Sequence, residues 1–529
     1  MSRKYIVFTG GVLSGLGKGI AAASIGNILS PTYKVIPIKC DGYLNVDPGT
    51  MNPIEHGEVF VLDDGGEVDM DFGHYERFLG VTCKFDWNLT MGKVFDRIRE
   101  KERRGDYLGK TVQMIPHVSN FIRDHFLRVG EETQAEVVLI EIGGTVGDME
   151  NELYIEAVKS LSRKVGRENV LFVHLTYVPI PSGVHEQKSK PTQQSVSLLR
   201  QKGIEPDIII ARCSEMLSDN IKNKIAVSCN LDKEDILTGL DVDNIYKVPL
   251  VFENQGMSKL LLKRLDLSSN TSLLPEWERL IKQRENAEKQ ITIAIAGKYT
   301  QLEDSYASII EALHHCESLF SVKIKLKWIE TSEGSFDLRG IDGVIVPGGF
   351  GSRGVEGKIN IIKHCRENKV PFLGLCYGLQ LAVVEFARNV CCLEGANTTE
   401  VDPSCLYPVI DILKEQKNIL DKGGTMRLGC YVANLKSNTM VNSLYCSSEA
   451  LERHRHRYEV NPEYHKILQD HGLIFSGLSP DGTLVEFIEL SKEIHPYFVA
   501  TQAHPELKSS LLNPAPLFKG LIEASLKKR

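Results

Sequence analysis

Short apolar runs that alternate with stretches of helical spacing constrain the fold of this 529-residue chain more than any other feature. Several runs are apolar at consecutive positions, as strands buried on both faces of a parallel sheet require. Such alternation predicts a doubly wound α/β sheet, which binds ligands beyond the carboxyl ends of its strands. In the first half the predicted strands are Tyr5–Thr9, Lys34–Lys39, Val137–Ile142, Val170–Val178 and Asp207–Ala211, and the predicted helices are Lys18–Leu29, Lys93–Glu102, Glu152–Val165 and Thr192–Lys202.

The alternation stops near residue 275 and then begins again. Pro275–Lys289 is rich in charge and is most simply a linker helix, after which Ile291–Ala296 is a new apolar run. A chain of 529 residues is also too long for one hydrophobic core. We therefore predict two α/β domains, residues 1–270 and 290–529, joined by a linker over 271–289. The further strands predicted in the second domain are Lys325–Ile329, Gly343–Val346, Phe372–Leu375 and Tyr497–Gln502.

A glycine-rich turn follows the first predicted strand, from Thr9 to Gly19. Successive backbone N–H groups in such a turn can surround a phosphate, and Lys18 would add a positive charge. The turn departs from the Walker A pattern, because Val12 stands in place of the first glycine and Gly19 in place of Ser or Thr. A purely structural glycine turn is the alternative, but it leaves a lysine at the start of the helix unexplained. We predict a relative of the phosphate loop whose magnesium ligands come from elsewhere.

Two places offer carboxylates for magnesium: the acidic run Asp63–Asp71, and Glu141 near the end of an apolar strand. Magnesium usually takes one or two carboxylates from a protein and its other ligands from phosphate and water. Most acidic residues in loops are merely solvated. Burying Glu141 after five apolar residues is costly unless a cation or hydrogen bonds compensate it, which makes it the stronger candidate.

A second basic cluster, Lys188–Gln194, follows a predicted strand and opens a predicted helix, with Pro191 at its start. Two lysines, a hydroxyl and amides beside a helix N-terminus form a plausible phosphate site. A solvated basic loop is the alternative. Two phosphate sites in one domain would indicate a kinase-like reaction between a nucleotide and a phosphorylated acceptor.

In the second domain Gly374–Gly378 reads Gly-Leu-Cys-Tyr-Gly, between an apolar run and a helical stretch. This is the pattern of a nucleophile elbow that exposes Cys376 at a helix N-terminus. Far downstream, His504 and Glu506 flank a proline; we expect extended backbone there, so that both side chains project to one side and supply a base and its orienting carboxylate. The glycine turn Gly343–Gly351 could complete an oxyanion hole opposite the Tyr377 N–H. The alternatives are an inert core cysteine and a surface ion pair.

Charge and composition exclude several functions. A net charge of −7 and a pI near 6.1 argue against a general nucleic-acid binder. We find no targeting signal or membrane-length apolar segment, so we expect no membrane association and a cytoplasmic protein. The twelve cysteines have no paired C-x-x-C spacing, which predicts neither a zinc site nor a disulfide framework.

Taken together, these motifs resemble the CTP synthase family, in which an amidoligase domain is fused to a class I glutamine amidotransferase domain. The resemblance covers nearly the whole chain. The residues that carry it are Phe8–Ala23, Asn45–Thr50, His56–Phe60, Gly73–Arg77, Glu141–Asp148, Lys188–Gln193, Pro347–Gly351, Gly374–Gln380, Gly424–Gly429, Arg453–Asn461 and His504–Glu506.

The resemblance implies a dethiobiotin-synthetase-like N-terminal fold and assigns site residues by position. It assigns ATP to Ser14, Gly15, Leu16, Gly17, Lys18, Gly19, Lys39 and Asp71, and Mg²⁺ to Asp71 and Glu141. UTP, or CTP as inhibitor, is assigned to Ser14, Asp148, Met149, Glu150, Lys188, Ser189, Lys190, Pro191, Thr192, Gln193 and Lys224. Glutamine is assigned to Gly349, Cys376, Tyr377, Gln380, Glu400 and Arg457, and the catalytic triad to Cys376, His504 and Glu506.

The implied reaction is ATP-dependent amination of UTP to CTP with ammonia from L-glutamine, the last step of de novo pyrimidine nucleotide synthesis. The resemblance also implies GTP as activator, CTP as inhibitor, and a homotetramer that can form filaments. Three residues depart from the family pattern: Tyr377, Gly42 and Ala503. Three alternatives stay open: an amidoligase that amidates carboxylates, a stand-alone glutaminase, and a non-enzymatic filament subunit.

Overall fold

The computed structural model describes residues 2–52, 57–268, 274–297, 303–332, 336–412 and 424–528. The chain forms two compact units, one of Met1–Pro48 and His74–Arg279 and the other of Gly49–Gly73 and Leu280–Arg529. Segment 49–73 thus belongs to the C-terminal unit, although it lies early in the sequence. The domain boundaries at 270 and 290 stay a prediction; residues 271–273 of the linker, and His56, lie outside the described residues.

The N-terminal unit contains a seven-stranded sheet in which every neighbouring pair is parallel. Its central strands are buried along nearly their whole length, which explains the consecutive apolar residues. In spatial order the strands are β5 (Asn88–Thr90), β2 (Val35–Asp41), β6 (Val137–Ile142), β1 (Lys4–Gly10), β7 (Val170–Tyr177), β8 (Ile208–Cys213) and β9 (Ile236–Leu240). The prediction of a doubly wound sheet is confirmed.

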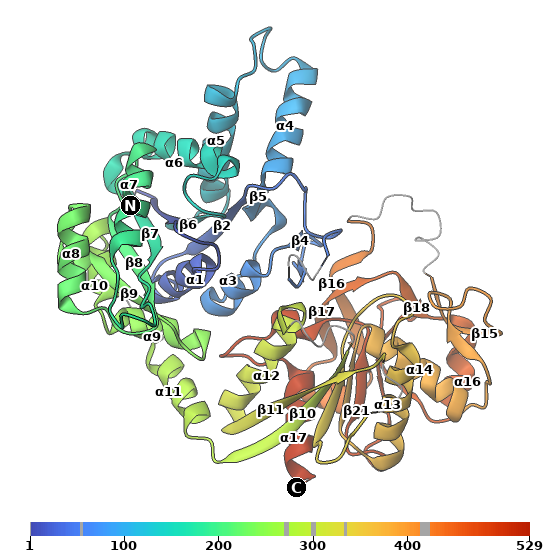
Figure 1. The fold of residues 1–529 in the computed structure, drawn as a ribbon. Helices are drawn as coiled ribbons and strands as arrows, with labels where there is room; N and C mark the ends of the chain where they lie inside the picture. The colour runs from blue at the N-terminus through green and yellow to red at the C-terminus, as the bar shows by residue number, and fades with distance from the viewer. Residues whose placement is uncertain are drawn as a thin grey trace. The chain divides into compact units, whose positions relative to one another are not determined.

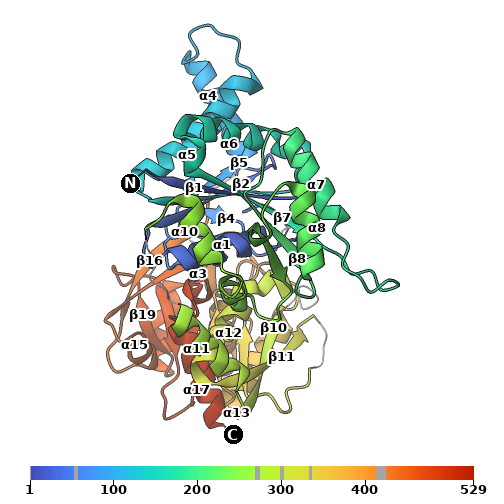
Figure 2. The same ribbon diagram turned by 90° about the vertical axis from the view of Figure 1, so that its left-hand side faces the viewer.

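Helices cover both faces of this sheet, with α1 and α10 on one face and α5 and α6 on the other (Figures 1 and 2). The predicted bounds of α1 and α6 are the observed ones. The helices of this part of the chain are α1 (Lys18–Leu29), α3 (Asp71–Leu79), α4 (Met91–Arg104), α5 (Ser119–Glu132), α6 (Glu152–Val165), α7 (Lys190–Gln201), α8 (Asp219–Cys229), α9 (Val248–Glu253), α10 (Met257–Leu265) and α11 (Leu274–Glu285).

The predicted linker helix is too long at its C-terminal end. Helix α11 ends at Glu285, and the next strand, β10, already begins at Lys289, where it pairs with Val322. Buried Ala287 lies in the turn between them. The end of the segment whose charge predicted helix is therefore part of a strand, because it pairs with a neighbouring strand.

The C-terminal unit contains a nine-stranded mixed sheet. The strands β11, β10, β12, β13 and β21 are parallel, as predicted, whereas β20, β19, β16 and β17 continue the sheet in antiparallel pairs that the sequence pattern did not reveal. The spatial order is β11 (Val322–Glu330), β10 (Lys289–Gly297), β12 (Gly343–Val346), β13 (Phe372–Leu375), β21 (Phe498–Thr501), β20 (Val485–Glu489), β19 (Ile474–Leu478), β16 (Arg427–Leu435) and β17 (Glu449–His456).

Two smaller sheets accompany it. One joins β14 (Ala396–Thr398), β15 (Tyr407–Ile412) and β18 (Tyr458–Val460). The other is a hairpin of β3 (Phe60–Val61) and β4 (Glu67–Val68), both within segment 49–73. The helices of the unit are α12 (Ala307–Phe320), α13 (Val355–Asn368), α14 (Tyr377–Asn389), α15 (Met440–Tyr445), α16 (His465–Asp470) and α17 (Pro516–Lys527).

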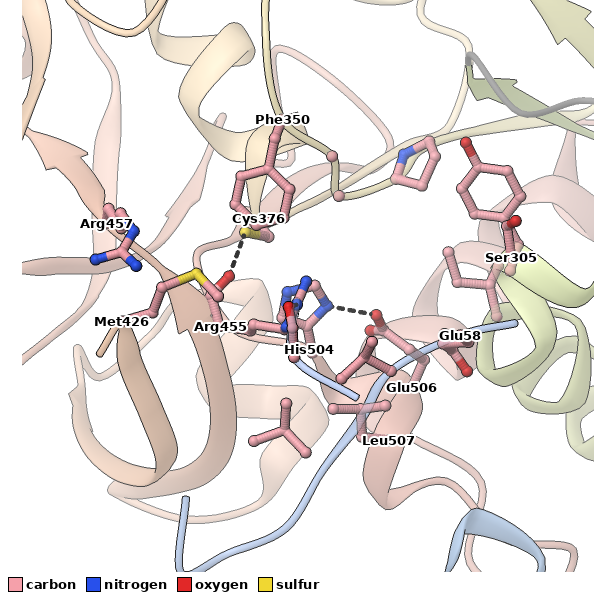
Figure 3. Close-up of a pocket in the computed structure, with 18 of the residues that line it drawn as sticks. Glu58, Ser305, Phe350, Cys376, Met426, Arg455, Arg457, His504, Glu506 and Leu507 are labelled. Atoms are coloured by element: carbon pink, nitrogen blue, oxygen red, sulfur yellow. Dashed lines mark hydrogen bonds and ion pairs between the residues drawn. The ribbon is translucent and has the colours of Figure 1, made fainter. Parts of the chain in front are cut away.

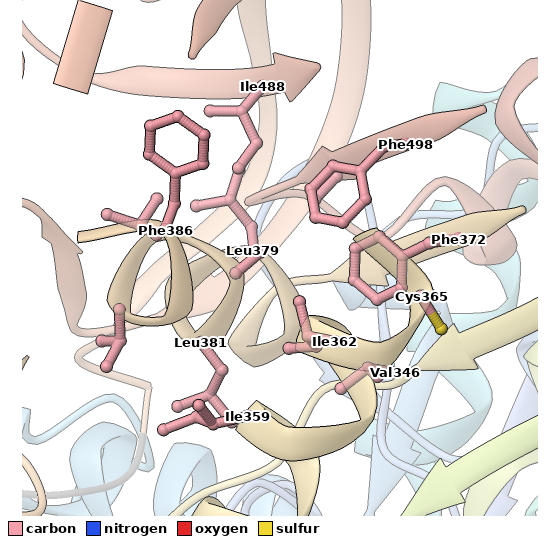
Figure 4. Packing of buried hydrophobic residues seen from close by; sticks show 14 of the residues in the cluster. Val346, Ile359, Ile362, Cys365, Phe372, Leu379, Leu381, Phe386, Ile488 and Phe498 are labelled. Carbon is pink, nitrogen blue, oxygen red and sulfur yellow. The ribbon is translucent and has the colours of Figure 1, made fainter. Parts of the chain in front are cut away.

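Two hydrophobic cores pack these helices on opposite faces of the nine-stranded sheet. Phe372 of β13 faces α13 and α14, whereas its neighbours Leu373 and Leu375 face α12 and α17, as the two-residue period of a strand requires. Figure 4 shows the first core, where the rings of Phe372 and Phe498 lie 4.6 Å apart. Each fully buried ring stabilises the fold by roughly 1.5–3 kcal/mol, so this core helps to hold β13, the strand that leads into Cys376.

Among the described residues, no helix combines the length and the hydropathy needed to cross a bilayer.

Candidate active sites

Cys376 occupies a sharp turn between β13 and α14. Its backbone has φ 51° and ψ −100°, a conformation that a non-glycine residue seldom adopts. Neither flanking glycine has room for a side chain. A Cβ on Gly378 would lie 2.2 Å from the Val346 carbonyl oxygen, and a Cβ on Gly374 would lie 2.8 Å from the Ala500 Cβ. The turn has the geometry of a nucleophile elbow.

The Cys376 sulfur is held by two neighbours, Arg455 of β17 and Gln502, which follows β21. The thiol donates to the Arg455 carbonyl oxygen at 3.8 Å, and the Gln502 side-chain amide donates to the sulfur at 3.6 Å. The sulfur also lies at the N-terminus of α14. A donor and a helix N-terminus together stabilise negative charge on a nucleophile.

His504 and Glu506 face the same turn (Figure 3). The His504 Nδ1 and Glu506 Oε1 atoms are 2.7 Å apart. The expected extended backbone is wrong, however, because Pro505–Lys508 is a turn of 3₁₀ helix that follows His504. The compact turn, not strand alternation, brings the two side chains together.

The charges around His504 favour its protonated form. Burial is the largest single effect and would lower the pKa of His504, but the negative charge of Glu506 opposes it. The charge and hydrogen bond of Cys376 act in the same direction, so the pKa of His504 lies well above its ordinary value. Sulfur, imidazole and carboxylate can therefore act as nucleophile, proton carrier and orienting group.

A cavity of about 790 Å³ opens in front of this group, within the C-terminal unit. Of the positions assigned to glutamine, Gly349, Cys376, Glu400 and Arg457 line it. The Glu400 carboxylate accepts the Gly351 N–H at 2.7 Å. A carboxylate and a guanidinium on the wall of one cavity match the ammonium and carboxylate groups of a free amino acid.

The side chains of Tyr377 and Gln380 are buried and are not among those that line the cavity. The Tyr377 hydroxyl donates to the Gly351 carbonyl oxygen at 3.0 Å, and the Gln380 amide donates to the Tyr458 carbonyl oxygen at 2.9 Å. Their side chains thus support the wall from behind.

In the N-terminal unit, the glycine turn after β1 leads directly into α1. Gly15 and Gly17 have φ 75° and 82°, so these positions need glycine's freedom. Ser14 and Gly15 are exposed, while Leu16 is buried and anchors the turn. The Lys18 ammonium donates to the Gly144 carbonyl oxygen at 2.8 Å, at the carboxyl end of β6. The turn therefore lies at the carboxyl edge of the parallel sheet, where such folds bind ligands.

Glu141 is buried near the carboxyl end of β6, beside Lys39 of β2. The Lys39 ammonium lies 3.7 Å from Asp41 and 3.8 Å from Glu141, and the other Glu141 oxygen accepts the Tyr75 hydroxyl. The described residues contain no group of three or more His, Cys, Asp or Glu side chains arranged for a metal. One or two carboxylates fit Mg²⁺ bound mainly through substrate phosphates.

The acidic run Asp63–Asp71 is largely committed to other contacts. Asp63 and Glu67 pair with arginines of the C-terminal unit, and Asp69 accepts the Asp71 N–H at 3.2 Å. Asp71 opens α3.

The second basic cluster begins after β7 and runs into the first turns of α7. Lys188 pairs with Glu186 at 2.7 Å, and the hydrogen bond and charge of Lys188, with a smaller effect from Lys224, lower the pKa of Glu186. Thr192 is buried. Its hydroxyl is hydrogen-bonded to the Thr176 hydroxyl and donates to the Tyr177 carbonyl oxygen. Of the remaining residues assigned to UTP, Asp148 accepts the Thr145 N–H, while Met149 and Glu150 are exposed.

The sequence patterns did not indicate several residues that support the candidate sites. His174 is buried between the Thr9 and Ser195 hydroxyls, at 2.8 Å from each, directly beneath the glycine turn. Burial, and then the charge of Lys18, lowers the pKa of His174 to about 3, so this imidazole is neutral. Gln502 escaped too, although its position two residues before His504 in a predicted strand was a usable signal.

Two of the departures from the family pattern have a visible setting. A Cβ on Gly42 would lie 2.6 Å from the Glu150 Cβ, so the chain packs closely there. Ala503 is fully buried and its N–H donates to the Thr501 hydroxyl.

Comparison with known proteins agrees with this geometry. Residues 301–524 match the family model "Glutamine amidotransferase class-I", and residues 4–267 match "CTP synthase N-terminus". The C-terminal unit is therefore a class I glutamine amidotransferase domain, joined to an α/β amidoligase domain.

Full-length relatives narrow the assignment. A CTP synthase of Methanocaldococcus jannaschii is 51% identical over 99% of this chain and 98% of its own length, and one of Bacillus subtilis is 49% identical over 99% and 98%. The glutaminase domain of Trypanosoma brucei CTPS, solved with bound acivicin, is 33% identical over 45% of this chain and 95% of its own, with a TM-score of 0.42. The chain belongs to the CTP synthase family and is a glutamine-dependent amidoligase.

Proposed function

We propose that this enzyme converts UTP to CTP with ATP and with ammonia released from L-glutamine, and that Cys376, His504 and Glu506 perform the release. The observation that carries the proposal is the convergence of a strained cysteine, an ion-paired histidine and a cavity lined by a carboxylate and a guanidinium within one unit. Membership of the CTP synthase family supports the choice of nucleotide.

In the glutaminase half-reaction the Cys376 sulfur, whose proton has passed to His504, attacks the side-chain amide carbon of glutamine. The oxygen of the tetrahedral intermediate would be stabilised by the Tyr377 N–H and by N–H groups of the turn around Gly349. His504 gives its proton to the leaving nitrogen, and ammonia departs as the thioester forms. His504 then takes a proton from water, which attacks the thioester and releases glutamate. Glu506 holds the imidazole in the required orientation.

In the amidoligase half-reaction ATP transfers its terminal phosphoryl group to O4 of the uracil ring. Ammonia then attacks C4, and phosphate leaves to give CTP. Lys18 would neutralise charge on the transferred group, with the glycine turn cradling the phosphates. Glu141, together with Asp71 by family resemblance, would hold Mg²⁺, which neutralises phosphate charge when bound. Buried Lys39 would orient Glu141.

The remaining assignments rest on resemblance. UTP, or CTP as inhibitor, would contact residues 148–150, 188–193 and Lys224, where the exposed lysines suit a triphosphate. GTP activation, a homotetramer, filaments and a cytoplasmic location are further predictions. Light scattering with and without nucleotides, and cell fractionation, test them.

The decisive experiment compares nitrogen sources in Cys376→Ala. We expect no CTP from glutamine and nearly unchanged CTP formation from ammonia, followed by the absorbance difference between cytosine and uracil. Cys392→Ala, at an exposed cysteine of the same unit, is the control and should keep both activities. If Cys376→Ala still uses glutamine, or loses ammonia-dependent synthesis as well, the division into two sites is wrong.

A further inference from the structure

Segment 49–73 forms part of the glutaminase site, although its residues belong to the N-terminal half of the sequence. Gly49, Thr50, Met51 and Glu58 line the same cavity as Cys376 and His504. Figure 3 shows Glu58 on this segment beside Glu506 and Leu507. The Glu58 carboxylate accepts the Ser308 N–H at 2.9 Å, at the start of α12.

Strand β17 connects this segment to the triad through two arginines. The Arg453 guanidinium pairs with Asp63 at 2.5 Å, and the Arg455 guanidinium pairs with Glu67 at 2.8 Å. Arg455 also donates to the Gly49 carbonyl oxygen at 3.2 Å. The side chains of Arg453 and Glu67 are 2% and 1% exposed, so these are charges removed from water.

The main chain of the same two arginines holds the reacting groups. The Arg453 carbonyl accepts the backbone N–H of His504 at 2.7 Å, and the Arg455 carbonyl accepts the Cys376 thiol at 3.8 Å. Because β17 is the last strand of its sheet, carbonyls two residues apart on its outer edge are available for such contacts. The position of β17 therefore sets where the thiol and the imidazole lie.

The opposite face of β17 is held by a separate ionic cluster. His454 and His456 alternate with the arginines and contact Glu486 and Glu459, which flank Arg427 at the core of the unit. Burial leaves both histidines with a pKa well below the ordinary value, so they are neutral. The face of β17 that bears Arg453 and Arg455 is therefore the one whose charged partners come from segment 49–73.

We propose that Arg453 and Arg455 are positioning residues of the glutaminase site, and that Asp63 and Glu67 complete the site by holding them. The inference rests on the proposed function, since it assigns a role in the Cys376 reaction. A displaced hairpin would shift β17 and with it both carbonyl contacts, and an error of about 1 Å in such a group can cost about a hundredfold in rate.

The test uses the full-length enzyme with Glu67→Gln and Glu67→Asp. We expect Glu67→Gln to lower kcat for glutamine hydrolysis about ten- to a hundredfold and to slow alkylation of Cys376, with ammonia-dependent synthesis within about twofold of wild type. Glu67→Asp keeps the charge and should retain most of the glutaminase activity. Glu317→Gln breaks a comparably buried pair with Arg284 in the same unit and should leave both activities unchanged.

Wild-type glutaminase kinetics with Glu67→Gln, or equal loss of both activities, would overturn the proposal. If Glu67→Gln does not fold, Asp63→Asn replaces it in the test. This variant breaks the pair between Arg453 and Asp63, whose carboxylate is more exposed, and the same results support or overturn the proposal. Glutamine hydrolysis and alkylation need no CTP formation. A failure of the proposed nucleotide reaction would therefore show in the wild type and stay distinct from a failure of this inference.

Discussion

Tyr377 is the elbow residue at which the resemblance to the family is imperfect, and its hydroxyl binds the loop that contacts the wall of the proposed glutamine cavity. It donates to the Gly351 carbonyl, and the Gly351 N–H in turn donates to Glu400 on the cavity wall. The Lys358 ammonium lies 5.2 Å from the centre of the Tyr377 ring. Tyr377 thus adds a hydrogen bond beneath the loop that follows β12.

We predict that Tyr377→Phe raises KM for glutamine about fivefold, because one net hydrogen bond contributes about 1 kcal/mol to holding the loop. Ammonia-dependent CTP formation should not change. Steady-state kinetics with both nitrogen sources measure the effect. An unaltered KM would mean that the loop is held by its other contacts.

Glu452 of β17 is a buried carboxyl group behind Glu506. It accepts the Tyr445 hydroxyl at 2.7 Å, and its second oxygen has no hydrogen-bond partner among the described residues. Burial raises the pKa of Glu452 from 4.5 to about 7, with a further rise from Glu506 and opposing effects of Tyr445, Lys508 and Arg453. A raised pKa in the folded state stabilises the protein below about pH 4.5, and that stability is lost as pH rises through 7.

We therefore predict that Glu452→Gln gains stability relative to wild type as pH rises from 5 to 8. The gain approaches about 3 kcal/mol for a shift of this size. Thermal unfolding of both proteins across this range should show a growing difference in Tm. Glu449→Gln, at an exposed position of the same strand, should show no such trend.

At the scale of elements, the elbow depends on close contact between the start of α14 and the end of β12. The close contact of a Cβ on Gly378 with the Val346 carbonyl cannot be relieved by rotating a side chain, because the obstacle is backbone. Local sequence revealed this elbow, since two glycines around a cysteine are visible without knowledge of the neighbours. The helices α1 and α6 and the strand β6 were predicted with their exact bounds, because their signals are also local in the sequence.

We predict that Gly378→Ala lowers stability by about 1–3 kcal/mol and reduces glutamine-dependent activity about tenfold or more, because α14 must shift away from β12 and move Cys376. Denaturation and glutaminase assays measure both effects. Gly183→Ala, where a Cβ would meet nothing within 4 Å, is the control. Normal glutamine hydrolysis in Gly378→Ala would show that the elbow tolerates this shift.

The antiparallel strands were missed because their burial depends on partners elsewhere. Strand β17 reads Glu-Ala-Leu-Glu-Arg-His-Arg-His, which has no apolar period, yet four of its last five residues are buried among polar and charged partners. The partners of Arg453 and Arg455 lie 390 and 388 residues away in the sequence. The 3₁₀ turn that joins His504 to Glu506 was missed because a proline constrains the residue before it without deciding the turn that follows.

At the scale of the whole molecule, each unit contains the residues that we propose for one half-reaction, apart from Asp71, which lies in segment 49–73. The phosphate turn, Lys39 and Glu141 belong to the N-terminal unit, and the triad belongs to the C-terminal unit. The two sites should therefore fail independently when mutated.

We predict that Lys18→Ala lowers CTP formation about a hundredfold or more from glutamine and from ammonia alike, because both need phosphoryl transfer. Glutamine hydrolysis measured by glutamate release should persist. Lys263→Ala, at an exposed lysine of α10, should behave as wild type. Normal CTP synthesis by Lys18→Ala would show that the glycine turn does not bind the ATP phosphates.

The sequence by itself determined the two α/β units, the glycine turn before Lys18, the elbow at Cys376 and the family, because each depends on neighbours within a few residues or on motif order. Only the tertiary structure decided that segment 49–73 completes the glutaminase cavity and that β17 is a strand. Buried charges stabilise a fold only when their partners are brought close, and no local pattern records which distant carboxylate an arginine will meet.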